Sequence, residues 1–448
     1  MWTRRQLLAS AAAPLMAQGR RPNFIVICTD DQGARDLGCL GATDLKTPHI
    51  DALAFSGTRF TNWYSNAPVC APSRAALMTG RYPVRAGVPT NGPFLPPAQR
   101  TTASLLKGGG YSTALIGKWH LGSDDASCPN AHGFEYFYGF HVGVVDFYSH
   151  RYYWGETSNR VNFHDLWRNR AEIFEDGQYL TERITQESLR FIDANRSRPF
   201  FLTATYNAPH YPMHAPEKYT QRFPGLAPER RMYAAMLAAV DDGVGEIRGA
   251  LKRHGLLENT LIFWIVDNGA TTEARAGLEQ KPATAGDNGT YRGFKFSLFD
   301  GGMHVPAMTS WPGVIRAGQV NPEIVMTMDI LPTICAAAGV RLPDGHTVDG
   351  RDILGVARGE AKSPHDAIFW DQGGQLAARR GRWKLVLNGQ LWDRTPEGRK
   401  PLQGEDSVFL SDLEVDPGET KNLRRAHPEI VDDLTGRIHR WREDVRRP

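Results

Sequence analysis

The chain has 448 residues, and its hydrophobic share of 41% and charged share of 23% are those of an ordinary globular protein. Its formal net charge is only +3, with no run of like charges, which excludes the strong field typical of a nucleic-acid-binding protein. The length predicts one large domain with a smaller one, and the 45 Gly and 29 Pro predict many ordered loops.

The first segment, residues 1–20, has the pattern of a signal peptide. Arg4 and Arg5 precede an apolar stretch over residues 7–17, which is shorter than the about 20 residues that span a bilayer. The paired arginines indicate the twin-arginine export route, with an ordinary signal peptide or an uncleaved anchor as alternatives. We therefore expect an exported protein, periplasmic or extracellular, without stable membrane insertion.

Three short apolar runs, rich in β-branched and aromatic residues, predict buried parallel strands over residues 23–28, 200–205 and 260–266. Helical patterns over residues 181–194 and 229–254 lie between them. Because strands alternate with helices, we expect an α/β sheet covered on both faces. Sites in such sheets form at the carboxyl ends of the strands.

Acidic and amide side chains follow two of these strands. Asp30 and Asp31 come after the first, and Asp267 and Asn268 come after the third. Adjacent carboxylates repel each other, and three carboxylates with one amide oxygen suit a hard cation, Ca²⁺ or, in a small wet cage, Mg²⁺. A helix cap or a solvated turn is the alternative for an isolated Asp-Asp pair, but the position of both pairs at strand ends favours a metal site.

Beyond about residue 340 the pattern changes. Residues 377–387 predict two strands around a Gly turn, residues 409–413 another strand, and residues 427–442 a terminal helix. We expect a main domain over residues 21–340 and a small α+β subdomain over residues 341–448.

The chain has five cysteines, too few for a disulfide scaffold, and none are spaced like the ligands of a zinc knuckle. Whether four of them pair depends on distances that the sequence does not contain; these are Cys28, Cys39, Cys128 and Cys335. The fifth, Cys70, belongs to a longer motif.

The segment from Val69 to Arg81 reads VCAPSRAALMTGR. It resembles the signature of the sulfatase family, Cys-x-Pro-Ser-Arg followed by a helix that ends in Thr-Gly-Arg. In that family a formylglycine-generating enzyme reads the Pro and the Arg and oxidises the Cys to formylglycine (3-oxoalanine). The resemblance implies this modification at Cys70 and this enzyme as a maturation partner. The alternative is an unmodified, buried Cys at the start of a helix.

The resemblance covers most of the chain from Arg21 onward. It implies an alkaline-phosphatase-like fold: a mixed, mainly parallel sheet with helices on both faces, and a smaller C-terminal α+β subdomain with an antiparallel sheet. It also implies one calcium ion, with the modified Cys70 as an additional oxygen ligand. The other implied metal ligands are Asp30, Asp31, Asp267 and Asn268.

Further motifs match the family in order along the chain. Residues 117–120 read Gly-Lys-Trp-His, residues 207–210 read Asn-Ala-Pro-His, and residues 292–295 read Arg-Gly-Phe-Lys. The resemblance therefore implies that the catalytic residues are Cys70, Arg74, Lys118, His120, His210 and Lys295. Two positions depart from the common pattern: Asp300, where Glu is commoner, and His304, where many members carry Arg. These departures put in doubt how the protein recognises the part of the substrate beyond the sulfate group.

These residue types suit the hydrolysis of a stable anion such as a sulfate ester, because cations hold the transferred group while a nucleophile attacks in line. A hydrated aldehyde carries two hydroxyls: one attacks sulfur, and the other collapses the covalent intermediate. Arg74 would hydrogen-bond the modified residue and balance the carboxylates. His120 would act as base or stabiliser, and His210 with Lys295 would protonate the leaving oxygen.

We therefore expect a sulfuric ester hydrolase that acts on aryl or carbohydrate sulfates. One alternative is a phosphate or phosphonate ester hydrolase of the same superfamily, and another is a non-catalytic sugar-binding protein. The sequence does not encode the alcohol part of the substrate, exo or endo action, or the oligomeric state. Aromatic residues cluster between Phe134 and Trp154. We expect most of them to belong to the core, with the later ones as candidates for a stacking wall against a sugar or aryl ring.

Overall fold

The structure is a computed structural model that describes residues 20–153, 162–394 and 398–447. A 10-stranded mixed sheet forms its centre, in the order β11-β2-β10-β9-β1-β8-β4-β5-β6-β7. Five central strands are mutually parallel: β9 (Thr260–Val266), β1 (Asn23–Thr29), β8 (Phe200–Thr205), β4 (Ser112–Lys118) and β5 (Tyr136–Phe140). The flanking strands are β2 (Thr58–Phe60), β6 (Trp167–Arg168), β7 (Ala171–Glu172), β10 (Ala307–Ser310) and β11 (Gln319–Asn321).

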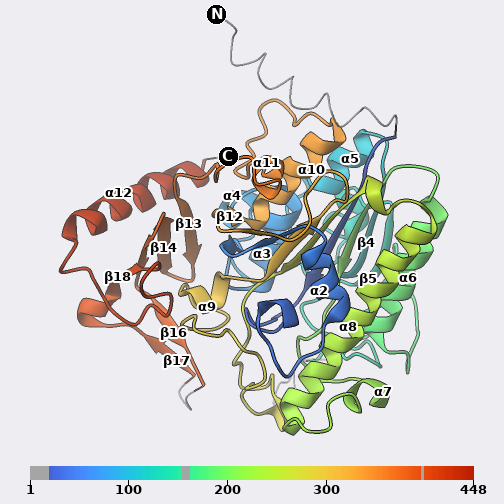
Figure 1. The fold of residues 1–448 in the computed structure, drawn as a ribbon, viewed down its shortest axis with the longest axis horizontal. Coiled ribbons are helices and arrows are strands. Elements are labelled where there is room, and N and C mark those ends of the chain that lie inside the picture. The colour runs from blue at the N-terminus through green and yellow to red at the C-terminus, as the bar shows by residue number, and fades with distance from the viewer. Residues whose placement is uncertain (1–19, 154–161, 395–397, 448) are drawn as a thin grey trace, which may run out of the picture.

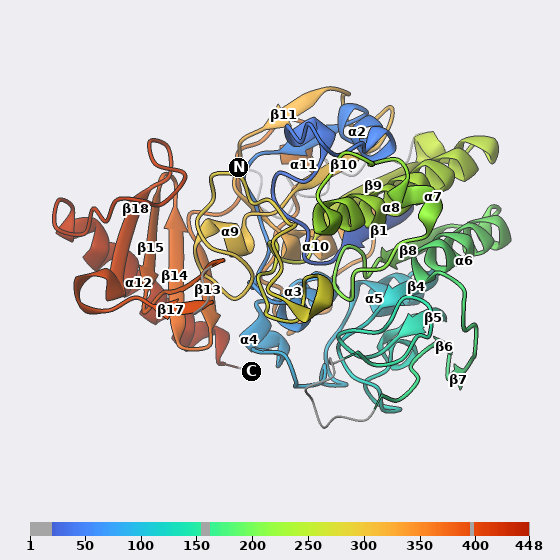
Figure 2. The ribbon, with the colours of Figure 1, turned by 90° about the horizontal axis from the view of Figure 1, so that it is seen from below.

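The side chains of β1 alternate between two hydrophobic cores, one on each face of the sheet. Ile25 and Ile27 belong to the core that contains α2 (Pro48–Phe55), α6 (Leu180–Asn195) and α8 (Pro228–Arg253). Phe24 and Val26 belong to the core that contains α3 (Cys70–Thr79), α5 (Thr102–Gly108) and α10 (Ile330–Ala338). Figure 2 shows α6 and α8 side by side over one face. Helices therefore cover both faces, as predicted.

A second sheet, antiparallel and four-stranded, follows in the C-terminal part. Its strands are β13 (Ile368–Gln372), β14 (Gln375–Arg380), β15 (Trp383–Leu387) and β18 (Val408–Asp412). Leu434 and Ile438 of α12 (Pro428–Val445) pack on one face, and Phe299 of the main part contributes to the core on the other. Figure 1 shows this sheet beside the large one. The predicted fold class is confirmed.

The remaining elements are short. They comprise two small sheets, β3 (Trp63–Tyr64) with β12 (Val325–Met326) and β16 (Gln390–Trp392) with β17 (Arg399–Pro401). They also comprise α4 (Pro83–Ala86), α7 (Glu217–Thr220), α9 (Asp300–Met303) and α11 (Leu354–Ala357). Single 3-10 turns occupy residues 38–40, 129–132, 257–259, 278–280, 327–329 and 404–407.

The parallel strands β4 and β5 were not among the predicted elements. Gly117 interrupts the apolar run of β4, and it has a φ of 119° with an ideal Cβ only 2.0 Å from the carbonyl oxygen of Thr205. Only glycine therefore fits this close approach to β8. Gly117 therefore makes β4 hard to recognise in the sequence, but it also allows β4 to approach β8 closely and to place Lys118 beside the end of that strand.

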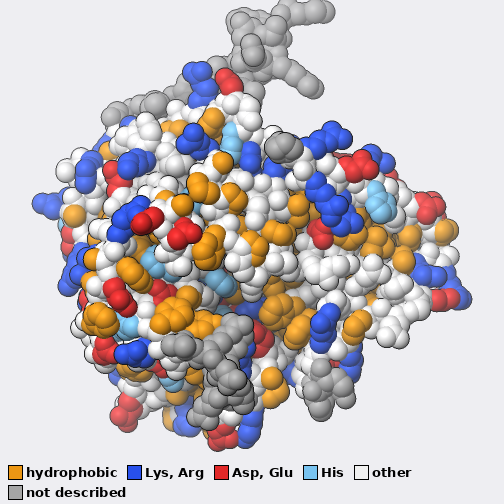
Figure 3. Space-filling view, turned by 180° about the vertical axis from the view of Figure 1, so that it is seen from behind, with side chains coloured by type: hydrophobic (Ala, Val, Ile, Leu, Met, Phe, Trp, Pro, Cys, Tyr) orange, Lys and Arg blue, Asp and Glu red, His pale blue; other side chains and the backbone are white. Residues whose placement is uncertain are grey.

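None of the five cysteines forms a disulfide, and all five lie within the described residues. Within the described ranges no helix is long and apolar enough to cross a membrane. Residues 1–19 of the predicted signal peptide lie outside the described residues. Acidic and basic side chains are interspersed on the face shown in Figure 3.

Candidate active site

The predicted site residues come from six separate parts of the chain and meet at the carboxyl edge of the central sheet. Asp30 and Asp31 directly follow β1, while Asp267 and Asn268 directly follow β9. Because β1 and β9 are parallel and adjacent, both pairs reach the same point. Asp31 has a φ of 58°, so the chain turns sharply after Asp30 and points the two neighbouring carboxylates into one site.

The four oxygen-bearing residues are all buried. The backbone N–H of Asp31 donates to Asp267 Oδ1 over 3.2 Å, and Asn268 Nδ2 donates to Asp31 Oδ1 over 2.7 Å. Asn268 Oδ1 is buried and has no hydrogen-bond partner among the described residues. Turning the Asn268 amide about χ2 exchanges its two terminal atoms and would place this oxygen among the carboxylates.

Two buried cations balance part of this charge. Arg74 Nη2 lies 2.8 Å from Asp267 Oδ2 and 3.2 Å from Asp30 Oδ2. Lys118 Nζ lies 2.5 Å from Asp30 Oδ2. Burial opposes ionisation of Asp30, but Lys118, His210 and Arg74 hold the pKa of its carboxyl below the usual range. Arg74 thus contacts the carboxylates as predicted, whereas no hydrogen bond joins it to Cys70 in the described part of the chain.

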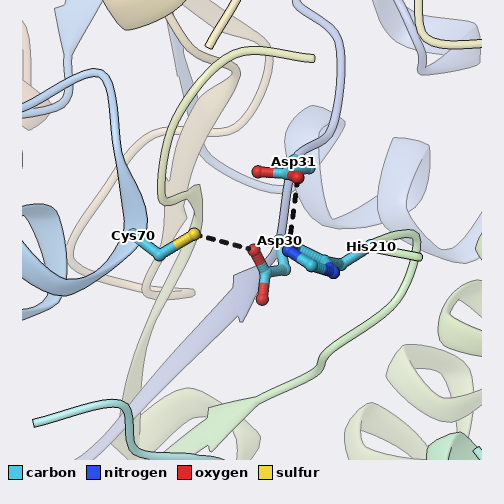
Figure 4. A group of neighbouring side chains, drawn as sticks. All are labelled: Asp30, Asp31, Cys70 and His210. Carbon is cyan, nitrogen blue, oxygen red and sulfur yellow. Dashed lines mark hydrogen bonds and ion pairs between the residues drawn. The ribbon is translucent and has the colours of Figure 1, made fainter. Parts of the chain in front are cut away.

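Cys70 is the first residue of α3 and is 1% exposed. Its Sγ lies 3.5 Å from Asp30 Oδ1 and points toward that carboxylate in Figure 4. Burial raises the pKa of the Cys70 thiol well above its ordinary value. An unmodified Cys70 is therefore a neutral thiol and a poor nucleophile.

On the other side of Asp31, Lys295, His210 and Glu273 form a compact group. Lys295 Nζ lies 2.9 Å from Asp31 Oδ2, 3.1 Å from Glu273 Oε2 and 3.4 Å from His210 Nε2. His210 Nδ1 lies 2.8 Å from the carbonyl oxygen of Tyr211, which only accepts hydrogen bonds, so Nδ1 carries the proton. Burial lowers the pKa of His210 to about 3. Lys295 is therefore the cationic member of the pair.

Glu273 was not among the predicted site residues. It lies six residues beyond Asp267, in a loop with no recognisable motif, and its approach to Lys295 depends on the path of that loop. Burial opposes its ionisation, but Lys295, His210 and Arg275 lower the pKa of Glu273 to about 2. Glu273 is therefore a second carboxylate, besides Asp31, that contacts the ammonium of Lys295. The charge of its residue type was the only available signal.

His120 follows β4 and has a φ of 60°. Its Nδ1 is buried and has no partner among the described residues. Burial, Lys118 and Arg74 all lower the pKa of His120 well below its ordinary value, so the ring is neutral. It lines a cavity of about 480 Å³ together with Phe94 and His141.

The carboxylates carry the signs of a cation site. Burial and the charge of Asp30 raise the pKa of Asp267 to about 7, and burial is the largest cause that raises the pKa of Asp31 to about 6. Carboxylate oxygens with an unpartnered amide oxygen are the donors that a hard divalent cation prefers. His210 Nε2 also lies 3.5 Å from Asp31 Oδ2 (Figure 4), but imidazole is not a typical calcium ligand. The donor set therefore fits Ca²⁺.

The two departures from the family pattern lie in a different environment from the one expected. Asp300 contacts Lys384 Nζ over 2.6 Å and accepts from Tyr64 over 2.7 Å, and its Oδ2 lies 3.2 Å from His304 Nδ1. Lys384 belongs to β15. Asp300 and His304 thus form a buried charge network toward the antiparallel sheet, which accounts for both residues without a bound substrate.

Comparisons with known proteins agree with this geometry. The family model described as Sulfatase matches residues 22–340. The chain is 31% identical to the steryl-sulfatase of Mus musculus, over 97% of this chain and 85% of that protein. It is 33% identical to arylsulfatase A of Bos taurus, over 96% of this chain and 88% of that protein.

A solved structure shares the fold over nearly its full length. The crystal structure of Ps i-CgsB in complex with k-i-k-neocarrahexaose superposes with a TM-score of 0.81 and 30% sequence identity. The match covers 94% of this chain and 93% of that one. Both the main sheet and the C-terminal sheet therefore belong to an architecture that is already known.

Proposed function

Since the chain belongs to the sulfatase family and is a sulfuric ester hydrolase, we propose that it cleaves organic sulfate monoesters with formylglycine made from Cys70. The observation that carries the proposal is the position of Cys70 in the site. Its side chain emerges at the N-terminus of α3, next to Asp30, and Lys118 contacts the same carboxylate. When formed, the hydrated aldehyde would supply the nucleophile that the buried thiol lacks.

The cations of the site would bind and orient the sulfate group. Lys118 and Lys295 reach the site through different carboxylates, since Lys118 contacts Asp30 and Lys295 contacts Asp31. Arg74 neutralises Asp267 and keeps the group of carboxylates compact. Preorganised positive charge stabilises the negative charge that develops during transfer, and burial strengthens it.

Two residues would act on protons. His120, whose ring is neutral, would act as base or stabiliser beside the nucleophile. Lys295 carries a proton that His210 Nε2 and two carboxylates orient, and it would donate toward the leaving oxygen. His210 would therefore act through Lys295.

One calcium ion would be held by Asp30, Asp31, Asp267 and Asn268, with the modified Cys70 as a further ligand. The ion would supply positive charge at the sulfate oxygens. The support for it is the donor set and the crowding of the carboxylates described above. We further propose that the protein is exported by the twin-arginine route, with Arg4 and Arg5 as its signal. We also propose that a formylglycine-generating enzyme recognises the segment from Cys70 to Arg74 and modifies Cys70.

The experiment compares the wild type with Cys70→Ser and Cys70→Ala, after expression with the maturation enzyme. Intact-peptide mass should show formylglycine at position 70 only in the wild type. We expect turnover of 4-nitrophenyl sulfate by the wild type and none by either variant, while circular dichroism and melting temperature stay close to wild type. Wild-type rates in either variant would refute the proposal. If the wild type turns over 4-nitrophenyl phosphate or an aryl phosphonate faster than 4-nitrophenyl sulfate, the result would favour the alternative of a phosphate or phosphonate ester hydrolase.

A further inference from the structure

Phe296, the residue after Lys295, has a backbone conformation that aromatic residues rarely adopt. Its φ is 75°, in the left-handed region, where the Cβ of a residue other than glycine comes close to the following carbonyl oxygen. Such a conformation persists only where the surrounding structure holds it, and it occurs preferentially at functional sites. The groups that hold Phe296 therefore also fix the direction in which the chain presents Lys295.

Both backbone polar groups of Phe296 form hydrogen bonds. Its N–H donates over 2.8 Å to the carbonyl oxygen of Pro68, which lies two residues before Cys70. Its carbonyl oxygen accepts from Nε2 of Gln375 over 2.9 Å. Gln375 is the first residue of β14 in the C-terminal sheet. Phe296 therefore connects the segment before the proposed nucleophile to the C-terminal sheet, and Lys295 lies directly next to this connection.

The Gln375 side chain is itself held in one orientation. It is 2% exposed and follows the turn between β13 and β14, where the two glycines at residues 373–374 have φ values of 57° and 89°. Two positive φ values are typical of the type I′ turn that closes a two-residue hairpin. Gln375 Oε1 accepts the backbone N–H of Gln390 over 2.8 Å and that of Leu298 over 3.4 Å. Because two donors face the oxygen, the amide nitrogen faces the Phe296 carbonyl.

Relaxation of Phe296 would displace Lys295. The angle φ describes rotation about the bond between N and Cα of Phe296, so a change toward the ordinary negative range turns the peptide that joins it to Lys295. Lys295 Nζ lies 2.9 Å from Asp31 Oδ2 and 3.1 Å from Glu273 Oε2, and a displacement of about 1 Å near a catalytic centre can lower a rate about 100-fold. The bond from Gln375 opposes this relaxation because it ties the Phe296 carbonyl to a buried side chain.

Resting on the proposed function, we propose that Gln375 is a positioning residue for Lys295, which acts through the backbone of Phe296. The C-terminal sheet is then part of the catalytic unit, because one of its side chains holds the strained residue that follows the proton donor. Proton donation contributes most when the leaving oxygen is strongly basic. Loss of the Gln375 side chain should therefore slow substrates with a poor leaving group more than substrates with a good one.

The test measures kcat/KM for 4-nitrophenyl sulfate, which has a good leaving group, and for phenyl sulfate, which has a poor one. The ratio of the two values does not depend on how much of a preparation is folded or matured, because both substrates meet the same enzyme. Gln375→Met keeps the length of the side chain but removes its hydrogen bonds. We expect it to raise the ratio of 4-nitrophenyl to phenyl sulfate by roughly 5- to 50-fold.

The matched control is Gln372→Met. Gln372 lies opposite Gln375 in the same hairpin and is 9% exposed, and its Oε1 has no hydrogen-bond partner in the part of the chain that the structure describes. This variant should keep the wild-type ratio. A second variant, Gln375→Glu, can donate to Phe296 only while its carboxyl is protonated. Compared with wild type at the same pH, its ratio should be unchanged at low pH and raised where the carboxyl is ionised.

Lys295→Met shows whether Gln375 acts through Lys295. It should raise the ratio at least as much as Gln375→Met does, and adding Gln375→Met to it should raise the ratio no further. A wild-type ratio in Gln375→Met would overturn the inference, as would an equal rise in Gln372→Met or a further rise in the double variant. A formylglycine-bearing wild type that hydrolyses neither aryl sulfate would instead overturn the proposed function.

Discussion

Replacing Glu273 by Gln tests whether this carboxylate positions Lys295 for catalysis. The Glu273 side chain is 15% exposed, and its Oε2 lies 3.1 Å from Lys295 Nζ. Gln keeps the volume and an acceptor oxygen but removes the charge. Lys295 then relaxes toward Asp31, which it already contacts at 2.9 Å, and its ammonium moves away from the position where the leaving oxygen must be protonated.

The size of the effect follows from the contact that is lost. A hydrogen bond to a charged group contributes about 1.5–3 kcal/mol. Each tenfold change in rate corresponds to about 1.4 kcal/mol, so kcat/KM should fall by about 10- to 150-fold. Because Lys295 is proposed to act on the leaving oxygen in the transition state, the loss should appear mainly in kcat and only weakly in KM.

The assay is steady-state hydrolysis of 4-nitrophenyl sulfate, with formylglycine content measured by mass so that rates refer to matured enzyme. Glu279→Gln is the matched control, because Glu279 lies in the same loop, is 76% exposed and pairs with exposed Lys281. It should behave as wild type. A Glu273→Gln enzyme with wild-type kcat, or a loss of equal size in Glu279→Gln, would refute the positioning role.

Three further predictions follow from the metal site, the leader and the buried charge network. Chelation with EDTA should lower both activity and melting temperature. When the free concentration of an ion is 100 times its Kd, its binding stabilises the native state by about 2.7 kcal/mol, and chelation removes this stabilisation. Asn268→Ala should contain less calcium by elemental analysis, and a fully active metal-free enzyme would contradict the site. Replacing Arg4 and Arg5 by Lys should trap the protein in the cytoplasm, and mass analysis of the trapped protein should find Cys70 already oxidised to formylglycine. If the trapped protein instead has a free thiol at position 70, the oxidation occurs after export. Lys384→Met should lower the free energy of unfolding in urea by about 3–5 kcal/mol, because the Lys384 side chain is 0% exposed and lies between Asp300 and Glu419. The control is Lys362→Met, since the Lys362 side chain is 91% exposed. It should change the free energy of unfolding by less than about 0.5 kcal/mol.

Much of the scaffold could be predicted because its signals are local. The strands at residues 23–28, 200–205 and 260–266 are continuous apolar runs, and the structure places strands there within one residue at each end. The helices predicted over residues 181–194 and 229–254 were likewise correct within one residue. Strand β4 escaped prediction because Gly117 breaks its run, and the reason for that glycine lies in the neighbouring strand.

The sequence by itself determined the family, the motif around Cys70 and the residue types that follow each strand. These features are contiguous, so a linear pattern contains them in full. It also placed Asp30, Asp31, Asp267 and Asn268 at strand ends, where parallel pairing of β1 with β9 brings them together.

Only the tertiary structure decided which further side chains complete the site. Glu273 and Lys295 are separated by 22 positions along the chain, and Asp165 and His141 by 24. Neither pair has a characteristic spacing, because the intervening loops follow paths set by packing against the rest of the chain. The partners of Lys295 are therefore properties of the folded chain, whereas the proposed nucleophile belongs to a contiguous motif, residues 70–74.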